Sequence, residues 1–233
     1  MSLKAWNGSS FVDGAPKVWN GSAFVEPQSI HVWNGSAFVE VWSAEPPFVE
    51  YTETFTTVGG YTYNIPAGSE YLDVILLGGG GGGGASAATR GCGGFAGSWA
   101  SVTLVRGVDI PTGTTQITGT VGAGGAGGNS SAASGSAGGN TTATATGWAG
   151  LTANGGAGGA GNSTSTQQAG FGAGDNVFNG VTYVGGTGGA TTGGTGQAGN
   201  PPGGGGAGGS FATLSWRGGG AGASGQVWIR AWK

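Results

Sequence analysis

Apolar residues are concentrated in several glycine-bounded segments of this 233-residue chain. These segments are rich in β-branched and aromatic residues, which suit a pleated, half-buried surface. They are YLDVILL (71–77), SWASVTLV (98–105), TTQITGTV (114–121) and GQVWIRAW (225–232). No part of the chain shows the apolar spacing of an amphipathic helix. The pattern therefore predicts a mostly β fold with essentially no α-helix.

A second pattern, at the beginning of the chain, is an internal repeat. The three copies are LKAWNGSSFVDG (3–14), PKVWNGSAFVEP (16–27) and IHVWNGSAFVEV (30–41). Each copy places Asn-Gly between two short aromatic runs, which is the strongest short-range signal for a hairpin with a type I′ turn. The repeats therefore predict three small β-hairpins.

Each predicted hairpin carries one Trp on its first arm and one Phe on its second. An isolated two-stranded hairpin is marginal in water, so these rings need another hairpin or another chain to cover them. We therefore predict that the repeats serve assembly, through Trp6, Trp19, Trp33, Phe11, Phe24 and Phe38.

Charge and proline content divide the chain further. The segment after the repeats contains Pro46-Pro47, and six of the ten acidic residues lie within residues 1–53. Later residues hold 55 of the 59 glycines. The predicted organisation is a hairpin region over 1–43, a Pro/Glu linker over 44–54 and a glycine-rich domain over 55–233.

Glycine recurs with a period of three in the large domain. Examples are AGGAGGN (123–129), GGAGGAGN (155–162) and VGGTGGATTGG (184–194), and 78–84 is glycine throughout. A polyproline-II helix has three residues per turn and no internal hydrogen bonds. We therefore predict a layered stack of polyglycine-II helices between the strands, with 78–84 surrounded by neighbours and Ala126 and Thr187 facing outward.

Three other glycine-rich architectures fit less well. Collagen needs a sustained Gly-X-Y period with abundant proline, whereas this chain has eight prolines. A flexible Gly/Ser linker would not contain interspersed apolar strands. Silk-like stacking would show long tracts of alternating Gly-Ala, which are absent from the sequence.

Candidate chemistry is sparse. The seven Lys and Arg residues are scattered, so no basic cluster suits nucleic acid, and no apolar run is long enough to span a membrane. Cys92 and His31 each stand alone, and the GxGxxG strings lack the strand-to-helix context of a nucleotide site. We predict no catalytic, cofactor or metal residues and a non-enzymatic protein. A hidden glycan depolymerase using Glu70, Asp73, Asp109 or Asp175 is the catalytic alternative left open.

The ordered series of glycine motifs resembles the glycine-rich domain of phage tail proteins. The series comprises FTTVGGYTYNIPAGSEYLDVILLGGGGGGG (55–84), GGFAGSWASVTL, ITGTVGAGGAGGNSS and the final GGGAGASGQVWIRAWK. The WNGSAFV repeats resemble those of minor tail proteins from phages of mycobacteria and related actinobacteria. The resemblance implies a virion protein at the tail tip or fibre, made in the host cytoplasm, contacting other tail proteins and taking part in host recognition. Because axial tail fibres are commonly trimeric, we predict a homotrimer through residues 1–50.

Residues 163–183 interrupt the glycine rhythm with polar and aromatic side chains, as a displayed binding loop does. We predict that they contact a host envelope glycan or glycolipid. The predicted receptor-binding residues are Phe171, Asp175, Asn176, Phe178, Tyr183, Trp148 and Trp216. The alternatives are that these aromatics fill gaps between glycine layers, that the chain is a tail-tip spacer or cap, or that it is a bacterial cell-surface adhesin.

Overall fold

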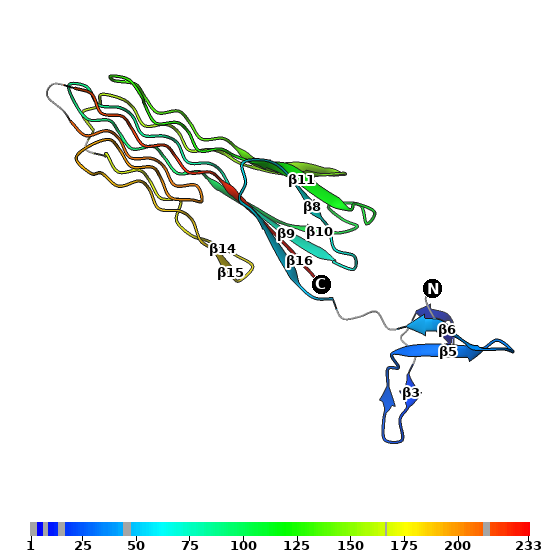
Figure 1. Ribbon diagram of the computed structural model, residues 1–233. Helices are drawn as coiled ribbons and strands as arrows, with labels where there is room; N and C mark the ends of the chain where they lie inside the picture. The colour runs from blue at the N-terminus through cyan, green and yellow to red at the C-terminus, as the bar shows by residue number, and fades with distance from the viewer. Residues whose placement is uncertain (1–3, 7–8, 14–16, 44–47, 166, 212–214) are drawn as a thin grey trace. The chain divides into compact units, whose positions relative to one another are not determined.

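The computed structural model describes the chain apart from residues 1–3, 7–8, 14–16, 44–47, 166 and 212–214. The chain forms two compact units, Met1–Phe48 and Val49–Lys233 (Figure 1). The described residues contain β-strands and no α-helix, as the sequence predicts. The strands of the first unit are β1 Lys4–Trp6, β2 Phe11–Asp13, β3 Val18–Trp19, β4 Phe24–Val25, β5 Ser29–Trp33 and β6 Phe38–Ser43.

In the first unit each repeat folds back on itself. Strands β1 and β2, β3 and β4, and β5 and β6 pair antiparallel, with the Trp of each repeat opposite its Phe. In the second and third copies the Trp and Phe rings meet edge to face at 5.3 Å between centroids. These are three separate two-stranded sheets within the described residues.

The turns of the second and third repeats differ from the predicted two-residue type I′ geometry, whereas residues 7–8 of the first turn lie outside the described part of the chain. In the second repeat, residues 20–23 form the loop, and Asn20 Oδ1 accepts hydrogen bonds from the backbone N–H of Ser22 (3.0 Å) and Ala23 (2.9 Å). Gly21 has φ +100°, whereas Asn20 does not have a positive φ. The prediction of a type I′ turn is therefore wrong for these two repeats. The Asn backbone is not in the left-handed region, and the Asn side chain caps a longer loop instead.

The second unit contains two four-stranded antiparallel sheets, with strand orders β10-β9-β16-β7 and β13-β12-β11-β8. A separate hairpin, β14–β15, lies between β13 and β16 in the chain. The strands are β7 Tyr51–Phe55, β8 Gly59–Asn64, β9 Tyr71–Leu77, β10 Trp99–Val105, β11 Gln116–Val121, β12 Thr141–Ala145, β13 Trp148–Ala153, β14 Asn176–Phe178, β15 Val181–Tyr183 and β16 Gln226–Trp232.

All four strands predicted from the glycine-bounded apolar segments are present, as β9, β10, β11 and β16. Residues 51–55, most of which the sequence pattern assigns to a linker, form strand β7 and pair with β16. The neighbouring residues 44–47 lie outside the described part of the chain. The large domain thus begins before Phe55.

Strand β9 is buried on both faces, which explains its nearly continuous apolar sequence. One face carries Leu72, Val74 and Leu76, each 0% exposed. Strands β12 and β13 of the other sheet contact β9, so this face contributes to a core between the sheets. The opposite face carries Asp73 and Ile75, and both are also fully buried.

Strand β9 leads directly into the glycine run 78–84, which is surrounded by chain (Figure 1). Its N–H groups donate to three segments in turn, with a period of three: 92–98, 136–139 and 220–223. Its carbonyl groups accept with the same period from segments 125–128, 156–159 and 206–209. The run is therefore hydrogen-bonded to six described segments that come from many parts of the chain.

Backbone proximity explains why this run is glycine. A Cβ on Gly81 would lie 2.1 Å from the carbonyl oxygen of Ala157, and the other glycines of the run have similar clashes. In the flanking runs the exposed positions also recur every three residues. Ala126 and Thr187 are exposed as predicted, whereas Gly125 and Gly128 are buried.

Candidate functional site

The segment predicted to be a binding loop is built into the glycine region instead. Phe171 donates its N–H to the carbonyl of Gly94 (3.0 Å) and accepts from Gly205 N–H (2.9 Å). Gln167 and Gln168 accept backbone hydrogen bonds from Gly93 and Gly208. Residues 167–173 are therefore another extended member of the glycine region, and the prediction of a displayed binding loop is wrong there.

Phe171 is partly covered by a second aromatic ring. Its ring stacks on Phe95 at 4.6 Å between centroids with an angle of 4° between planes. Phe171 remains 36% exposed and Phe95 51% exposed. The pair is an apolar patch on the side of the glycine region.

The second half of the segment forms the hairpin β14–β15, which lies on one face of the first sheet. Its turn has φ +46° at Asn179 and +75° at Gly180, the positive values that a type I′ turn requires. Asn176 Nδ2 donates to Ser101 Oγ on β10 (2.9 Å). Tyr183 packs edge to face on Trp228 of β16 at 5.5 Å. The hairpin therefore covers part of β10, β9 and β16.

This packing changes the roles predicted for the segment's side chains. Tyr183 is 4% exposed, so its assignment as a receptor contact is wrong, because the ring fills the space between hairpin and sheet. Asp175 accepts a hydrogen bond from Gly185 N–H (3.1 Å), and Phe178 is half-buried. Burial, followed by the nearby Asp73 carboxylate, raises the pKa of Tyr183 above its ordinary value.

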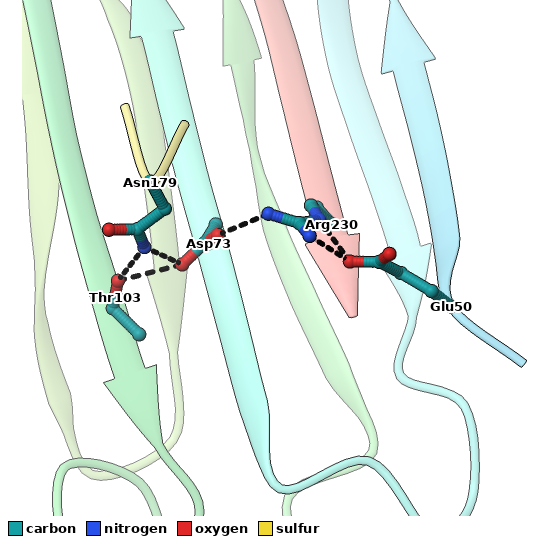
Figure 2. A network of polar contacts seen from close by, with 5 residues as sticks. All are labelled: Glu50, Asp73, Thr103, Asn179 and Arg230. Carbon is teal, nitrogen blue, oxygen red and sulfur yellow. Dashed lines mark hydrogen bonds and ion pairs between the residues drawn. The ribbon is translucent and has the colours of Figure 1, made fainter. Parts of the chain in front are cut away.

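A row of polar side chains anchors the hairpin tip to the sheet (Figure 2). Asn179 Nδ2 donates to Asp73 Oδ1 and to Thr103 Oγ1, both at 2.9 Å. Thr103 Oγ1 in turn donates to Asp73 Oδ1 at 2.7 Å. On the other side, Arg230 Nη1 lies 3.5 Å from Asp73 Oδ2, and Arg230 binds Glu50 through Nε and Nη2. The row joins β10, β9, β16 and the approach to β7.

The row compensates a fully buried charge. The Asp73 side chain is 0% exposed, that of Arg230 is 21% exposed and that of Glu50 is 48% exposed. The hydrogen bond to Glu50 is the main cause that raises the pKa of Arg230, so the guanidinium stays charged. An isolated carboxylate would be very unfavourable here, and Arg230 is the cation that offsets it.

An open pocket of about 500 Å³ adjoins this row. Its lining consists of Tyr71, Thr103, Val105, Asn179, Arg230 and Trp232. Tyr71 and Trp232 stack at 4.3 Å with an angle of 20° between planes, and the Arg230 guanidinium lies 5.9 Å from the Trp232 ring. Aromatic rings thus form one part of the pocket and polar groups another.

The sequence does not single out any residue of this pocket as a binding candidate, although Asn179 lies within the segment 163–183 that is predicted to bind a glycan. One signal is available: Asn179-Gly180 lies between VF and VTY, the same hairpin pattern that identifies the repeats. The second signal is Asp73, an acidic residue within an otherwise apolar strand. It is a weak indication of a site, because a single acid does not show which residues surround it. Its partners Thr103 and Asn179 are 30 and 106 residues away in sequence.

The remaining predicted receptor residues lie elsewhere. Trp148 is half-buried on β13, in the other sheet. Trp216 is 44% exposed and precedes Arg217, whose N–H donates to Ser86 Oγ (2.8 Å). Among the described residues, no hydrogen bond or ring contact joins either tryptophan to the β14–β15 hairpin.

The repeat aromatics are exposed within the first unit. Trp19 and Trp33 are 59% and 54% exposed, and Phe24 and Phe38 are 68% and 71% exposed. Trp6 and Phe11 are paired through their backbones, and their side chains lie outside the described atoms. These four aromatic side chains therefore remain uncovered within the described part of this unit.

Metal-ligating side chains are dispersed over the part of the chain that the structure describes. There, no three or more His, Cys, Asp and Glu side chains gather as metal ligands would. The same residues include no helix with the length and apolar character needed to cross a bilayer.

Comparisons with known proteins agree with the glycine-rich architecture. Residues 56–232 match the model of a family described as the glycine-rich domain. The chain is 54% identical over 197 residues to the Gene 32 protein of Mycobacterium phage L5, covering 82% of this chain and 85% of the relative. It is 46% identical over 202 residues to the Gene 32 protein of Mycobacterium phage D29, covering 82% and 86%. The chain therefore belongs to the glycine-rich domain family and is a phage protein related to these Gene 32 proteins.

Proposed function

We propose that this chain is a non-enzymatic minor tail protein, located at the tail tip or fibre of its phage, that takes part in recognition of and adsorption to the host cell. Support comes from its phage relatives and from a rigid glycine region that ends in a cluster of loops. The virion is its proposed location, and other tail proteins are its proposed neighbours.

The rigid region is best explained as a layered sandwich of polyglycine-II helices. Each helix would have three residues per turn, which accounts for the threefold rotation of hydrogen-bond partners around residues 78–84. It also accounts for one exposed position in three along AGGAGGN (123–129). Inter-helix hydrogen bonds, each contributing about 1 kcal/mol net, would stabilise the array.

The observation that carries the recognition role is the set of connections at the end of the array away from the strands, which we name the tip loops. They comprise residues 86–91, 129–133, 161–165 and 190–195, together with 210–211 and 215–217 (Figure 1). Thr89 N–H binds Asn162 Oδ1 (2.8 Å), and Arg90 bridges to Ser163, so loops distant in sequence support one another. Loops held by a rigid scaffold are common positions for binding residues.

A pocket of about 450 Å³ lies among the tip loops, with Arg90, Ser163, Ser165 and Phe211 in its lining. Phe211 is 50% exposed. This combination of aromatic, cationic and hydroxyl groups suits a glycan or glycolipid headgroup of the host envelope. We therefore propose the tip loops as the receptor contact, in place of residues 163–183 as a whole.

Phage carrying Arg90→Ser and Phe211→Ser are expected to adsorb more slowly to host cells, because two exposed contacts are lost. The matched control is Val108→Ser, since Val108 is 80% exposed in the turn that follows β10 at the other end of the unit. The measurement is the rate at which free particles disappear from a cell suspension. Normal adsorption by the tip variant, with folded protein present at the tail in immunogold images, would favour a purely structural spacer or cap.

We also propose that the chain is a homotrimer assembled through the exposed rings of the repeats. Light scattering of the purified chain is expected to give three times the chain mass, and Trp19→Ser with Trp33→Ser is expected to give a monomer. The control is Trp216→Ser, an exposed tryptophan of the other unit. A wild-type monomer at micromolar concentration, with red-shifted emission from the repeat tryptophans, contradicts the trimer.

A further inference from the structure

The pocket beside the Asp73 row has features of a ligand site that differ from those of the tip loops. Its six lining side chains come from β9, β10, β16 and the turn of the β14–β15 hairpin. Its volume of about 500 Å³ lies within the range of about 300–1,000 Å³ typical of small-molecule sites. Because it lies where β9 begins, it is at the end of the sheet opposite the glycine run.

The polar groups of the pocket are fixed before any ligand arrives. Asn179 Nδ2 uses its two hydrogens on Asp73 and Thr103, which orients the amide. Asn179 Oδ1 then points away from the row (Figure 2) and accepts no hydrogen bond from the described residues. Thr103 Oγ1 is held at 2.7 Å from Asp73 Oδ1. Asn179 and Thr103, which both line the pocket, are therefore held in fixed orientations.

Two buried polar atoms beside the pocket, one on Asp73 and one on Trp232, have no hydrogen-bond partner among the described residues. Asp73 Oδ2 makes no hydrogen bond, although Arg230 Nη1 lies 3.5 Å away, and Trp232 Nε1 makes none either. A buried polar atom without a partner is destabilising. Such atoms are uncommon in folded proteins, so each of them calls for an explanation.

The charges favour a neutral ligand over an anion. Arg230 is the cation in the pocket lining, and its charge is matched by Asp73 and Glu50. Nearby, Lys233 pairs with Glu70 at 3.6 Å. No positive charge of the lining is left uncompensated for a phosphate or carboxylate.

The aromatic groups favour a ring-shaped ligand. Tyr71 and Trp232 are both half-buried and form one stacked pair at the pocket. Aromatic pairs of this kind provide apolar contact area with little conformational entropy to lose. The apolar C–H face of a sugar ring packs on such surfaces, while its hydroxyls need fixed donors and acceptors.

We propose that this pocket binds a neutral sugar ring, with Tyr71 and Trp232 contacting its apolar face and Asn179, Thr103 and Arg230 bonding to its hydroxyls. This site goes beyond the proposed role in adsorption and does not depend on it. The site is distinct from the tip loops in position and in its lining residues.

The test uses the purified full-length chain and a panel of methyl glucoside, methyl mannoside and methyl galactoside, with galacturonate as the charged counterpart. Saturation-transfer difference NMR is expected to show transfer to at least one neutral glycoside. Trp232→Leu and Tyr71→Leu are each expected to weaken its binding about tenfold, the factor that corresponds to about 1.4 kcal/mol of lost contact. Thermal unfolding confirms that each variant is folded.

The matched control is Trp216→Leu, which removes an exposed tryptophan elsewhere in the same unit and is expected to bind sugar as the wild type does. If Trp232→Leu fails to fold, Val105→Glu at the half-buried pocket edge replaces it and is expected to abolish transfer. Absence of transfer from all three neutral glycosides would overturn the proposal. Equal or stronger binding of galacturonate, or binding unaffected by the pocket variants, would also overturn it.

Discussion

Gly81→Ala is expected to prevent the second unit from folding. The new Cβ would lie 2.1 Å from the carbonyl oxygen of Ala157, whereas ordinary contact begins at 3.4 Å. Relief of this clash requires separating two hydrogen-bonded segments, and Gly81 both donates to Phe95 and accepts from Gly206. The combined loss of several kcal/mol is comparable with a total stability of about 5–15 kcal/mol.

Gly113→Ala is the matched control for this substitution. A Cβ on Gly113 would have no other atom within 4 Å, and this glycine does not have a positive φ. We expect Gly113→Ala to be neutral or to stabilise the protein by about 0.4–1 kcal/mol, because it restricts the unfolded chain. Soluble yield and thermal unfolding followed by circular dichroism compare the two variants. A Gly81→Ala protein that melts within about 2 °C of the wild type, a shift of less than 1 kcal/mol, would falsify the close-packed description.

Arg230→Met is expected to destabilise the second unit by about 3–5 kcal/mol at neutral pH, because it leaves the buried Asp73 carboxylate without its cation. Asp73 is 0% exposed, so water cannot compensate the charge without opening the hairpin. For a domain of this size the loss corresponds to a decrease in Tm of about 6–20 °C. Chemical denaturation measures the free energy of unfolding directly.

Two further variants test the cause of that loss. Glu50→Gln removes the exposed partner of Arg230 and is expected to change stability by less than about 1 kcal/mol. Asp73→Asn combined with Arg230→Met removes both buried charges and keeps an acceptor for Thr103 and Asn179. We expect the double variant to be more stable than Arg230→Met alone. Equal stabilities for those two variants would show that the loss comes from packing of the Arg230 side chain.

The sequence predicts the parts of this fold that depend on local pattern. The β-branched and aromatic residues of QVWIRAW identify β16, and the period of three identifies Ala126 and Thr187 as exposed. The segments TTATA and WAGLTA, which form β12 and β13, do not stand out as strands because their residues are small and include glycine. Their pairing depends on neighbours distant in sequence.

The candidate pocket cannot be found from the sequence for the same reason. Asp73 acquires its importance from being buried next to Arg230, 157 positions later, and under Asn179. Tyr183 shows the opposite error, since an aromatic in a polar segment suggests a binding side chain. Its ring instead packs on Trp228, which a one-dimensional pattern does not reveal.

The glycine run 78–84 also limits how this protein can fold. Its hydrogen-bond partners extend as far as Ala223, so the run cannot be satisfied until almost the whole unit has left the ribosome. Strand β16, which lies between β9 and β7, is made later still. Such long-range pairing makes folding slow, because the ends of long loops must meet before their contacts form. The nascent glycine region, which carries few charges, therefore stays unfolded until late in synthesis and then folds in one late step.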